Sequence, residues 1–385
     1  MNHQAFYGIF VYMNQETVLK GYLWVKLGIL FSIALIISLF SMFPSAVENI
    51  YSLGIYPGLS STLRTLTMRI PFSLGDIFYY ILIISLVINA GKIGLLVYRK
   101  KYSRERFVLF LFRLATMVLW VYILFKLLWG LNYNRLGIAS QLKIGKNEYT
   151  RDEVVQLTHR LIDKLNECRR QIKDTILPSP ALDTIYKEAY RSYQQISMQY
   201  EFLNYRKRSI KESLFSGVGD YMGFTGYYNP FTGEAQLRTD IPRVLVPFIT
   251  CHEMAHQLGY ASESEANFVG YLAASASTDV YFRYSVYLDM FSYAQSEEIL
   301  LFGKEKDFKK FESVFKENRD CLDTLVKKDR REIRDFFNQR KNRISPTVSS
   351  LYDQYLKMNK QLKGVESYNE VIGWLIGYQK KFGKL

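Results

Sequence analysis

Residues 252–256 read His252-Glu253-Met254-Ala255-His256, and the interpretation of the whole chain starts from this stretch. Residues four apart on an α-helix project from the same face, so both imidazoles can bind one Zn²⁺ ion. Glu253 lies beside them and can take the proton of a metal-bound water. The chain has only 4 histidines, so chance seldom produces this spacing. The alternative is an ordinary helix with two unrelated histidines.

A catalytic zinc needs a third protein ligand and one open position for water. A histidine at position 262 would complete the pattern HExxHxxGxxH, but that residue is Ser262, and no histidine follows His256. The third ligand is therefore predicted to be a carboxylate of the next helix, Glu265 or Glu263. Glu265 is favoured because apolar residues three to seven positions later mark the buried face that it shares. In the competing interpretation, Glu265 and Ser262 form a capping box.

A β-hairpin is predicted before the motif helix, with strands over 223–228 and 234–239 and a turn over 229–233. An exposed strand edge can hold an extended peptide through main-chain hydrogen bonds. A hairpin that only packs beneath the helix is an equally weighted alternative. The predicted substrate-binding residues are Glu234, Ala235, Gln236 and Leu237 on the edge strand, and Tyr228, Tyr227 or Tyr260 as hydrogen-bond donor to a developing oxyanion.

The charge distribution divides the chain of 385 residues at about residue 130. Residues 1–130 carry 12 basic and 4 acidic side chains, and the remainder carries 38 and 32. Three apolar runs, over 22–43, 77–98 and 107–130, are each long enough to cross a hydrocarbon layer of about 30 Å. We therefore predict a membrane anchor over 1–130 and a soluble domain over 131–385. The lipid bilayer is an expected partner, and the oligomeric state is left open.

Basic residues near the spans predict the sidedness of the domain. The connector over 99–106 contains five basic residues, whereas the 44–75 loop contains two. By the positive-inside rule, the connector is cytoplasmic and residues 131–385 lie outside the cytoplasmic (inner) membrane. A cleaved signal peptide is disfavoured by the 21 residues before the first span. The odd number of cysteines, 3, argues mildly against this sidedness.

The net charge of +14 does not indicate nucleic-acid binding, because 8 of these charges belong to the apolar first 130 residues. The soluble part is predicted to be mainly helical. A capping box at Thr150 and Glu153 begins the first helix. The predicted helices cover 150–173, 182–205, 244–258, most of 263–301, 304–343 and 348–379.

Several segments together resemble the bacterial domain-of-unknown-function family 3810. They are 70–76 (IPFSLGD), 129–133 (WGLNY), 226–236 (GYYNPFTGEAQ), 252–268 and 367–371 (SYNEV). This family looks like membrane-anchored zinc metallopeptidases of the gluzincin kind. The resemblance implies a helical zincin-like domain in which His252, His256 and Glu265 hold the metal and Glu253 is the general base.

The sequence therefore predicts a membrane-anchored zinc metallopeptidase that acts on a peptide or protein substrate. Glu253 would accept a proton as water attacks the peptide carbonyl and return it to the leaving amine. The main alternative is a non-catalytic membrane protein with a structural zinc site or a helical binding platform. An intramembrane protease is disfavoured, because the apolar stretch of the motif helix is too short to span.

Overall fold

The computed structural model describes residues 3–99, 103–144, 149–342 and 370–385, together with a few positions between 346 and 357. It is mainly helical, as predicted, and contains one small sheet. Lys100, Lys101 and residues 367–369, which contributed to the sequence predictions, lie outside the described residues.

Three long apolar helices, which we call the spans, lie where the sequence predicts membrane-spanning segments and are apolar enough to cross a membrane. They are α1 (His3–Phe40), α4 (Leu74–Tyr98) and α5 (Arg104–Leu128), and their span-length stretches have mean hydropathies of 2.1 to 2.3. Ser73 caps α4 by accepting a hydrogen bond from the Asp76 N–H at 3.0 Å. Most of their large apolar side chains are exposed, which a lipid environment accommodates and water does not.

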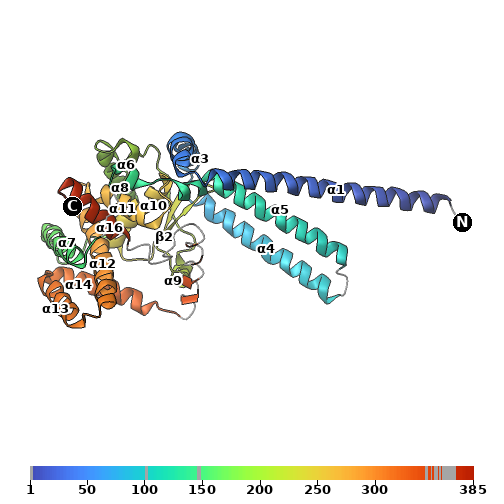
Figure 1. Cartoon of the computed structure of the whole chain (residues 1–385). Coiled ribbons are helices and arrows are strands. Elements are labelled where there is room, and N and C mark those ends of the chain that lie inside the picture. Colours follow the sequence, from blue (N-terminus) through green and yellow to red (C-terminus); the bar gives the residue numbers. More distant parts are fainter. Residues whose placement is uncertain are drawn as a thin grey trace.

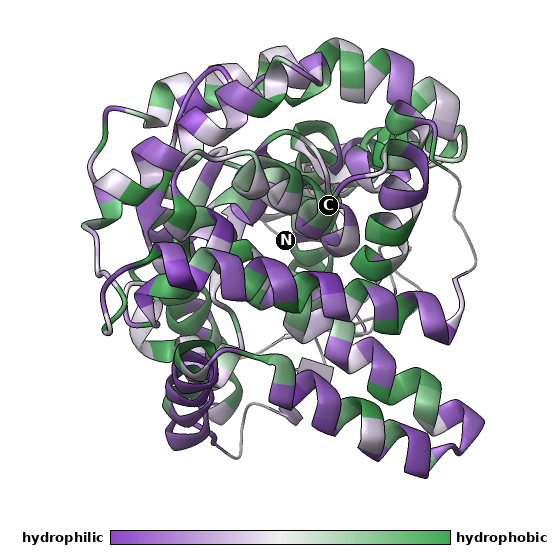
Figure 2. Ribbon diagram, turned by 90° about the vertical axis from the view of Figure 1, so that its left-hand side faces the viewer, coloured by the Kyte–Doolittle hydropathy of each residue, from purple (hydrophilic) through white to green (hydrophobic). Residues whose placement is uncertain are grey.

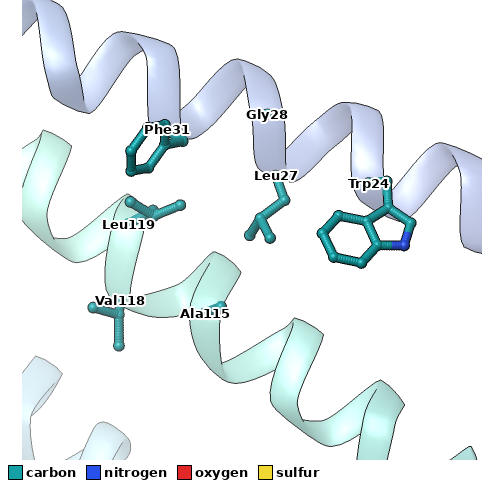
Figure 3. Close-up of a pocket in the computed structure, with 7 residues that line it drawn as sticks. All are labelled: Trp24, Leu27, Gly28, Phe31, Ala115, Val118 and Leu119. Carbon is teal, nitrogen blue, oxygen red and sulfur yellow. The ribbon is translucent and has the colours of Figure 1, made fainter.

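The three spans project together from one side of the remaining structure (Figure 1). The C-terminal end of α4 and the N-terminal end of α5 both lie far from it. In the spans, α1 packs along α5, and the Trp24 and Phe112 rings meet edge to face at 4.8 Å. Figure 3 shows an apolar groove between these two helices. The residues that line it are Trp24, Leu27, Gly28, Phe31, Ala115, Val118 and Leu119.

The connection between the first two spans folds against the domain. It forms α2 (Pro44–Ala46), the π-helix η1 (Val47–Ile55) and α3 (Tyr56–Thr67). The hydroxyls of Tyr56 and Ser60 donate to the Gln257 carbonyl at 3.1 and 2.6 Å. The predicted division at residue 130 assigns this connection to the anchor, whereas its contacts tie it to the domain.

The domain consists of helices around a hydrophobic core, and Figure 2 shows peripheral helices that carry hydrophilic and hydrophobic residues together. The capping box of Thr150 and Glu153 is present at the start of α7. The long helix predicted within 263–301 is α12, which begins after Asp279, whose side chain caps it, and a shorter helix, α11, precedes it. The helices are η2 (Gly130–Asn134), α6 (Ile138–Leu142), α7 (Arg151–Gln171), α8 (Leu182–Ser197), η3 (Glu201–Leu203), η4 (Ser216–Val218), α9 (Gly219–Met222), η5 (Arg243–Leu245), α10 (Val246–Gln257), α11 (Glu263–Ser275), α12 (Val280–Glu305), α13 (Phe308–Cys321), α14 (Thr324–Gln339) and α16 (Val371–Phe382).

The sheet contains the predicted hairpin and one further strand. The strands are β1 (Ile210–Glu212), β2 (Gly226–Asn229) and β3 (Glu234–Leu237), in the order β1-β3-β2. β3 runs antiparallel to β2 and parallel to β1. The prediction that β3 offers a free edge is wrong, because β3 is the central strand and all four of its residues are buried.

Two of the predicted substrate-binding residues on β3 instead hold the start of α4. The Glu234 carboxylate accepts hydrogen bonds from the Leu74 and Gly75 N–H groups at 3.2 and 2.7 Å. The Gln236 amide lies 3.0 Å from the Ser73 hydroxyl. These residues thus connect the sheet to the second span.

Candidate metal centre

The motif helix α10 carries both histidines and packs closely against α11. Pro247 occupies its first turn, and Gly259, with a φ of +92°, allows the chain to leave its C-terminal end sharply. A Cβ atom at Gly270 of α11 would lie 3.1 Å from the His252 Cα. This close approach brings the first turn of α11 beside the motif histidines.

His252, His256 and Glu263 converge on one point. The Glu263 Oε2 atom lies 3.2 Å from the His252 Nε2 and 3.6 Å from the His256 Nε2. The three side chains are between 6% and 12% exposed, so solvent still reaches the group. Two imidazoles and one carboxylate form a ligand set that catalytic zinc sites use. The residues present therefore fit the ion that the sequence motif implies.

The orientation of His256 is set by its other ring nitrogen. The His256 Nδ1 lies 2.7 Å from the Tyr260 carbonyl oxygen, so its N–H can donate there and leave Nε2 for a metal. The Trp129 indole donates to the His256 carbonyl at 3.0 Å, and its ring contacts the imidazole edge to face. The His252 Nδ1 is buried and has no hydrogen-bond partner in the described part of the chain.

The structure does not place Glu265 beside the histidines, so the preference for it over Glu263 is wrong. The Glu265 Oε1 atom accepts a hydrogen bond from the Ile138 N–H at 2.8 Å. Residues two apart on a helix point about 200° apart, so the two carboxylates cannot face one point together. Ser262 begins α11 without a side-chain cap, so the alternative capping box is also absent. α11 is buried on nearly every face, and apolar neighbours therefore do not identify the side that faces the histidines.

Glu253 lies next to the two histidines and against β2. A Cβ atom at Gly226 would lie 2.7 Å from the Glu253 Oε1, which is closer than van der Waals contact. Any residue larger than glycine at this position would therefore clash with the Glu253 carboxylate. The Glu253 Oε2 is buried and has no hydrogen-bond partner among the described residues. Burial raises the pKa of Glu253 to about 7, although the two histidines lower it.

The negative charge of Glu263 shifts the pKa of the neighbouring His256, and the two histidines shift the pKa of Glu263. Burial lowers the pKa of His256, but the Glu263 carboxylate outweighs this effect and raises it to about 9. Burial also raises the pKa of Glu263, and the two histidines outweigh it, so the net shift is downward. The carboxylate and the imidazoles thus stabilise one another's charged forms.

The predicted oxyanion donors are engaged elsewhere. The Tyr227 hydroxyl donates to the Asp76 carboxylate at 2.6 Å, and the Tyr260 hydroxyl donates to Gln141 at 2.7 Å. The Tyr228 hydroxyl lies 3.5 Å from that of Tyr56, and the Tyr228 ring lies 5.2 Å from that of Trp129. Glu253 lies against Gly226 of β2, an outer strand of the sheet that the sequence interpretation did not select. Its signal in the sequence was the glycine that begins it, Gly226.

The structure defines a mainly helical protein with three apolar helices suited to a membrane and a buried cluster of two histidines and one glutamate. The chain belongs to the family described as protein of unknown function DUF3810, whose model matches residues 51–376. The match includes α4, α5 and most of the domain, and it confirms the family that the sequence segments resemble. No curated protein and no solved structure matches the chain.

Proposed function

We propose that this protein is a membrane-anchored, zinc-dependent peptidase in which His252, His256 and Glu263 hold the ion. The observation that carries the proposal is the convergence of two Nε2 atoms and one carboxylate oxygen, all within 4.8 Å of one another, on the motif that also supplies Glu253. A zincin-like arrangement is supported by the antiparallel hairpin and the motif helix that lie against each other.

Glu253 is assigned the proton transfers. When bound, zinc supplies a Lewis acid that polarises a peptide carbonyl and acidifies water. The Glu253 carboxylate accepts one proton of the attacking water, while the water oxygen bonds to the carbonyl carbon. The same proton then passes from Glu253 to the amine nitrogen as the carbon–nitrogen bond breaks. Gly226 keeps the space beside this carboxylate open.

The substrate is assigned to the free edge of β2. Among the described strands, β2 pairs on one side only, and its first residue contacts Glu253. A peptide can add to such an edge through main-chain hydrogen bonds, which hold its backbone extended irrespective of sequence. This assignment replaces the β3 edge that the sequence interpretation favoured.

A structural zinc site or a helical binding platform is the second candidate function. Structural zinc sites are closed by four protein ligands. Among the described residues, the group that can hold a metal contains three. This count leaves a position for water and favours a catalytic site.

Glu253→Gln tests the proposal, because it keeps the shape of the side chain and removes the base. We expect the purified full chain in detergent to retain one zinc per molecule by elemental analysis. We also expect it to lose peptide-library hydrolysis by about 10²-fold or more. A zinc-free parent chain, or unchanged hydrolysis by the variant, would contradict the proposal. Chelator-treated parent protein serves as the metal-free control.

A further inference from the structure

The connection between β1 and β2 exposes apolar side chains at the level where the second span begins. Leu214, Val218, Tyr221 and Met222 are between 45% and 54% exposed. Contiguous apolar exposure of this kind marks a surface that contacts a protein or a membrane. In Figure 1, α9 lies on the side of the domain from which α4 leaves. We call residues 213–223 the apolar loop.

The apolar loop is fastened directly to the second span. The Tyr80 and Phe215 rings stack with centroids 4.5 Å apart, and the Tyr80 hydroxyl donates to the Leu214 carbonyl. The Leu214 N–H donates to the Asp76 carboxylate at 2.8 Å. Tyr80 lies six residues into α4, which corresponds to about 9 Å along the helix axis. The loop is therefore held beside the first turns of a helix that is apolar enough to cross a membrane.

Charge on the apolar loop is compatible with a lipid surface. Its only charged residue is Asp220. The Asp220 carboxylate accepts a hydrogen bond from Arg238 at 2.8 Å and lies 3.6 Å from Arg340. Tyr221 adds an aromatic ring with a polar end, a side chain that is enriched where bilayers meet water. No uncompensated charge of the loop therefore opposes its entry into the headgroup region.

We propose that the apolar loop inserts into the headgroup region of the bilayer, on the side of the membrane where the domain lies. The apolar loop is attached to the first turns of α4, so any partner that covers the loop must also fit beside a membrane-spanning helix. We therefore infer that lipid covers the loop. The exposed side chains of Val218 and Met222 would supply the apolar contact with the lipid, in the manner of an interfacial anchor.

Lipid contact by this loop has a consequence for the substrate, and this consequence rests on the proposed function. Met222 precedes Gly226 by four residues, at most about 14 Å of extended chain. Gly226 begins β2 and contacts Glu253. The Tyr227 hydroxyl, on the same strand, donates a hydrogen bond to the Asp76 carboxylate of α4. The substrate class is then a polypeptide segment that lies close to the bilayer surface, such as the region next to a membrane span or a lipid anchor.

Spin labels on the full chain in lipid vesicles test the lipid contact without requiring any activity. Cys168 and Cys251 are buried and Cys321 is exposed, so Cys321→Ser provides a background for labelling. The test variant is Met222→Cys. The matched control is Met198→Cys, because Met198 is 83% exposed and follows α8, which packs against α10 and α11 of the domain.

We expect the label at 222 to be accessible to oxygen and shielded from a water-soluble nickel chelate, and the label at 198 to show the reverse. Equal exposure of both labels to the chelate would overturn the proposal. Spin–spin broadening at 222 that disappears on dilution with unlabelled protein would also overturn it, because a second copy would then cover the loop.

Val218→Asp tests the substrate class. We expect it to slow cleavage of a lipid-tethered peptide about tenfold, which corresponds to about 1.4 kcal/mol of surface binding. Cleavage of the same peptide free in solution should be unchanged. Equal rates on the tethered peptide for parent and variant would overturn this substrate class. If the parent cleaves neither peptide, the proposed function fails, and the spin labels still decide the lipid contact.

Discussion

Arg135 and Glu48 form a buried, two-pronged ion pair, in which the Arg135 Nε and Nη2 lie 2.9 and 2.8 Å from the two Glu48 oxygens. Glu48 comes from the connection between the first two spans, and Arg135 follows the third. Arg135 also donates to the Gly259 carbonyl at 3.1 Å, and its guanidinium lies over the Tyr260 ring. The connection between the first two apolar helices therefore supports, through Arg135, the turn at Gly259 and Tyr260, and the Tyr260 carbonyl lies against the His256 Nδ1.

Glu48→Gln is expected to destabilise the folded protein by about 3–5 kcal/mol, because it leaves the buried Arg135 charge without the carboxylate that it pairs with. The free energy of unfolding, measured by denaturant titration in detergent micelles, checks this expectation. Glu167→Gln is the control, since Glu167 pairs with Lys164 on the exposed surface, where such pairs contribute about 1 kcal/mol or less. Equal effects of the two substitutions would contradict the assigned role.

Glu263→Gln and Glu265→Gln separate the two predicted metal ligands. The first should weaken zinc binding about a hundredfold or more, because it removes the carboxylate that faces both histidines. The second should leave zinc affinity unchanged and lower stability by about 1–3 kcal/mol, because it weakens the hydrogen bond from Ile138. Competition with a zinc-sensitive dye measures the affinities, and a larger loss in Glu265→Gln would reverse the assignment.

Gly226→Ala is expected to displace Glu253 without removing the metal. The added methyl group would lie 2.7 Å from the Glu253 Oε1 and 2.9 Å from its Cγ, closer than van der Waals contact allows. Hydrolysis should fall about 10²-fold while zinc content stays at the parent level. Gly217→Ala is the matched control, because a Cβ atom there meets nothing within 4 Å. Full activity of Gly226→Ala would show that Glu253 does not act at this position.

The buried Glu298 predicts a stability that decreases as the pH rises. Burial raises the pKa of this carboxyl to about 7, although hydrogen bonds from Thr158 and Asn318 lower it. The folded state then binds the proton more tightly than the unfolded state, whose carboxyl has the ordinary value of 4.5. The contribution of Glu298 to the free energy of unfolding is fully present below about pH 4.5 and is lost as the pH rises through about 7. The loss amounts to up to about 3 kcal/mol. Glu298→Gln should flatten this part of the curve of unfolding free energy against pH; an unaltered curve would contradict the assignment.

Reporter fusions test the proposed sidedness. The C-terminal end of α4 and the N-terminal end of α5 lie at the end of the spans away from the domain, and the basic residues of the sequence between these helices favour a cytoplasmic connection. Alkaline phosphatase, which is active only outside the cytoplasm, should be active when fused after Leu385. A fluorescent protein that matures only in the cytoplasm should stay dark at the same position. The opposite pair of results would place the domain in the cytoplasm.

Features that depend on neighbours in the chain were predicted well. The three spans, the motif helix, the capping box at Thr150 and the hairpin all follow from patterns within about 20 residues. The predicted helix ends were less accurate where a single side chain decides them. Asp279 and Asp323 each cap a new helix within the ranges predicted to be helical, and the sequence interpretation did not place these boundaries.

Features that depend on distant segments were missed. Glu48 and Arg135 are 87 residues apart and carry no local signal of their pairing. The position of β3 at the centre of the sheet depends on β1, which is only three residues long. The strand β3, which was expected to offer a free edge, is therefore the central strand, although the hairpin itself was predicted correctly.

The sequence by itself determined that two imidazoles share one helix face beside Glu253, because side chains four residues apart on an α-helix point in nearly the same direction. It also determined the three long apolar helices, because their length and apolarity follow directly from runs of neighbouring residues. Only the tertiary structure decided that Glu263 completes the cluster and that β2 lies against Glu253. Both depend on how α11 and the sheet pack on α10, and packing between elements is set by shape and burial over the whole chain.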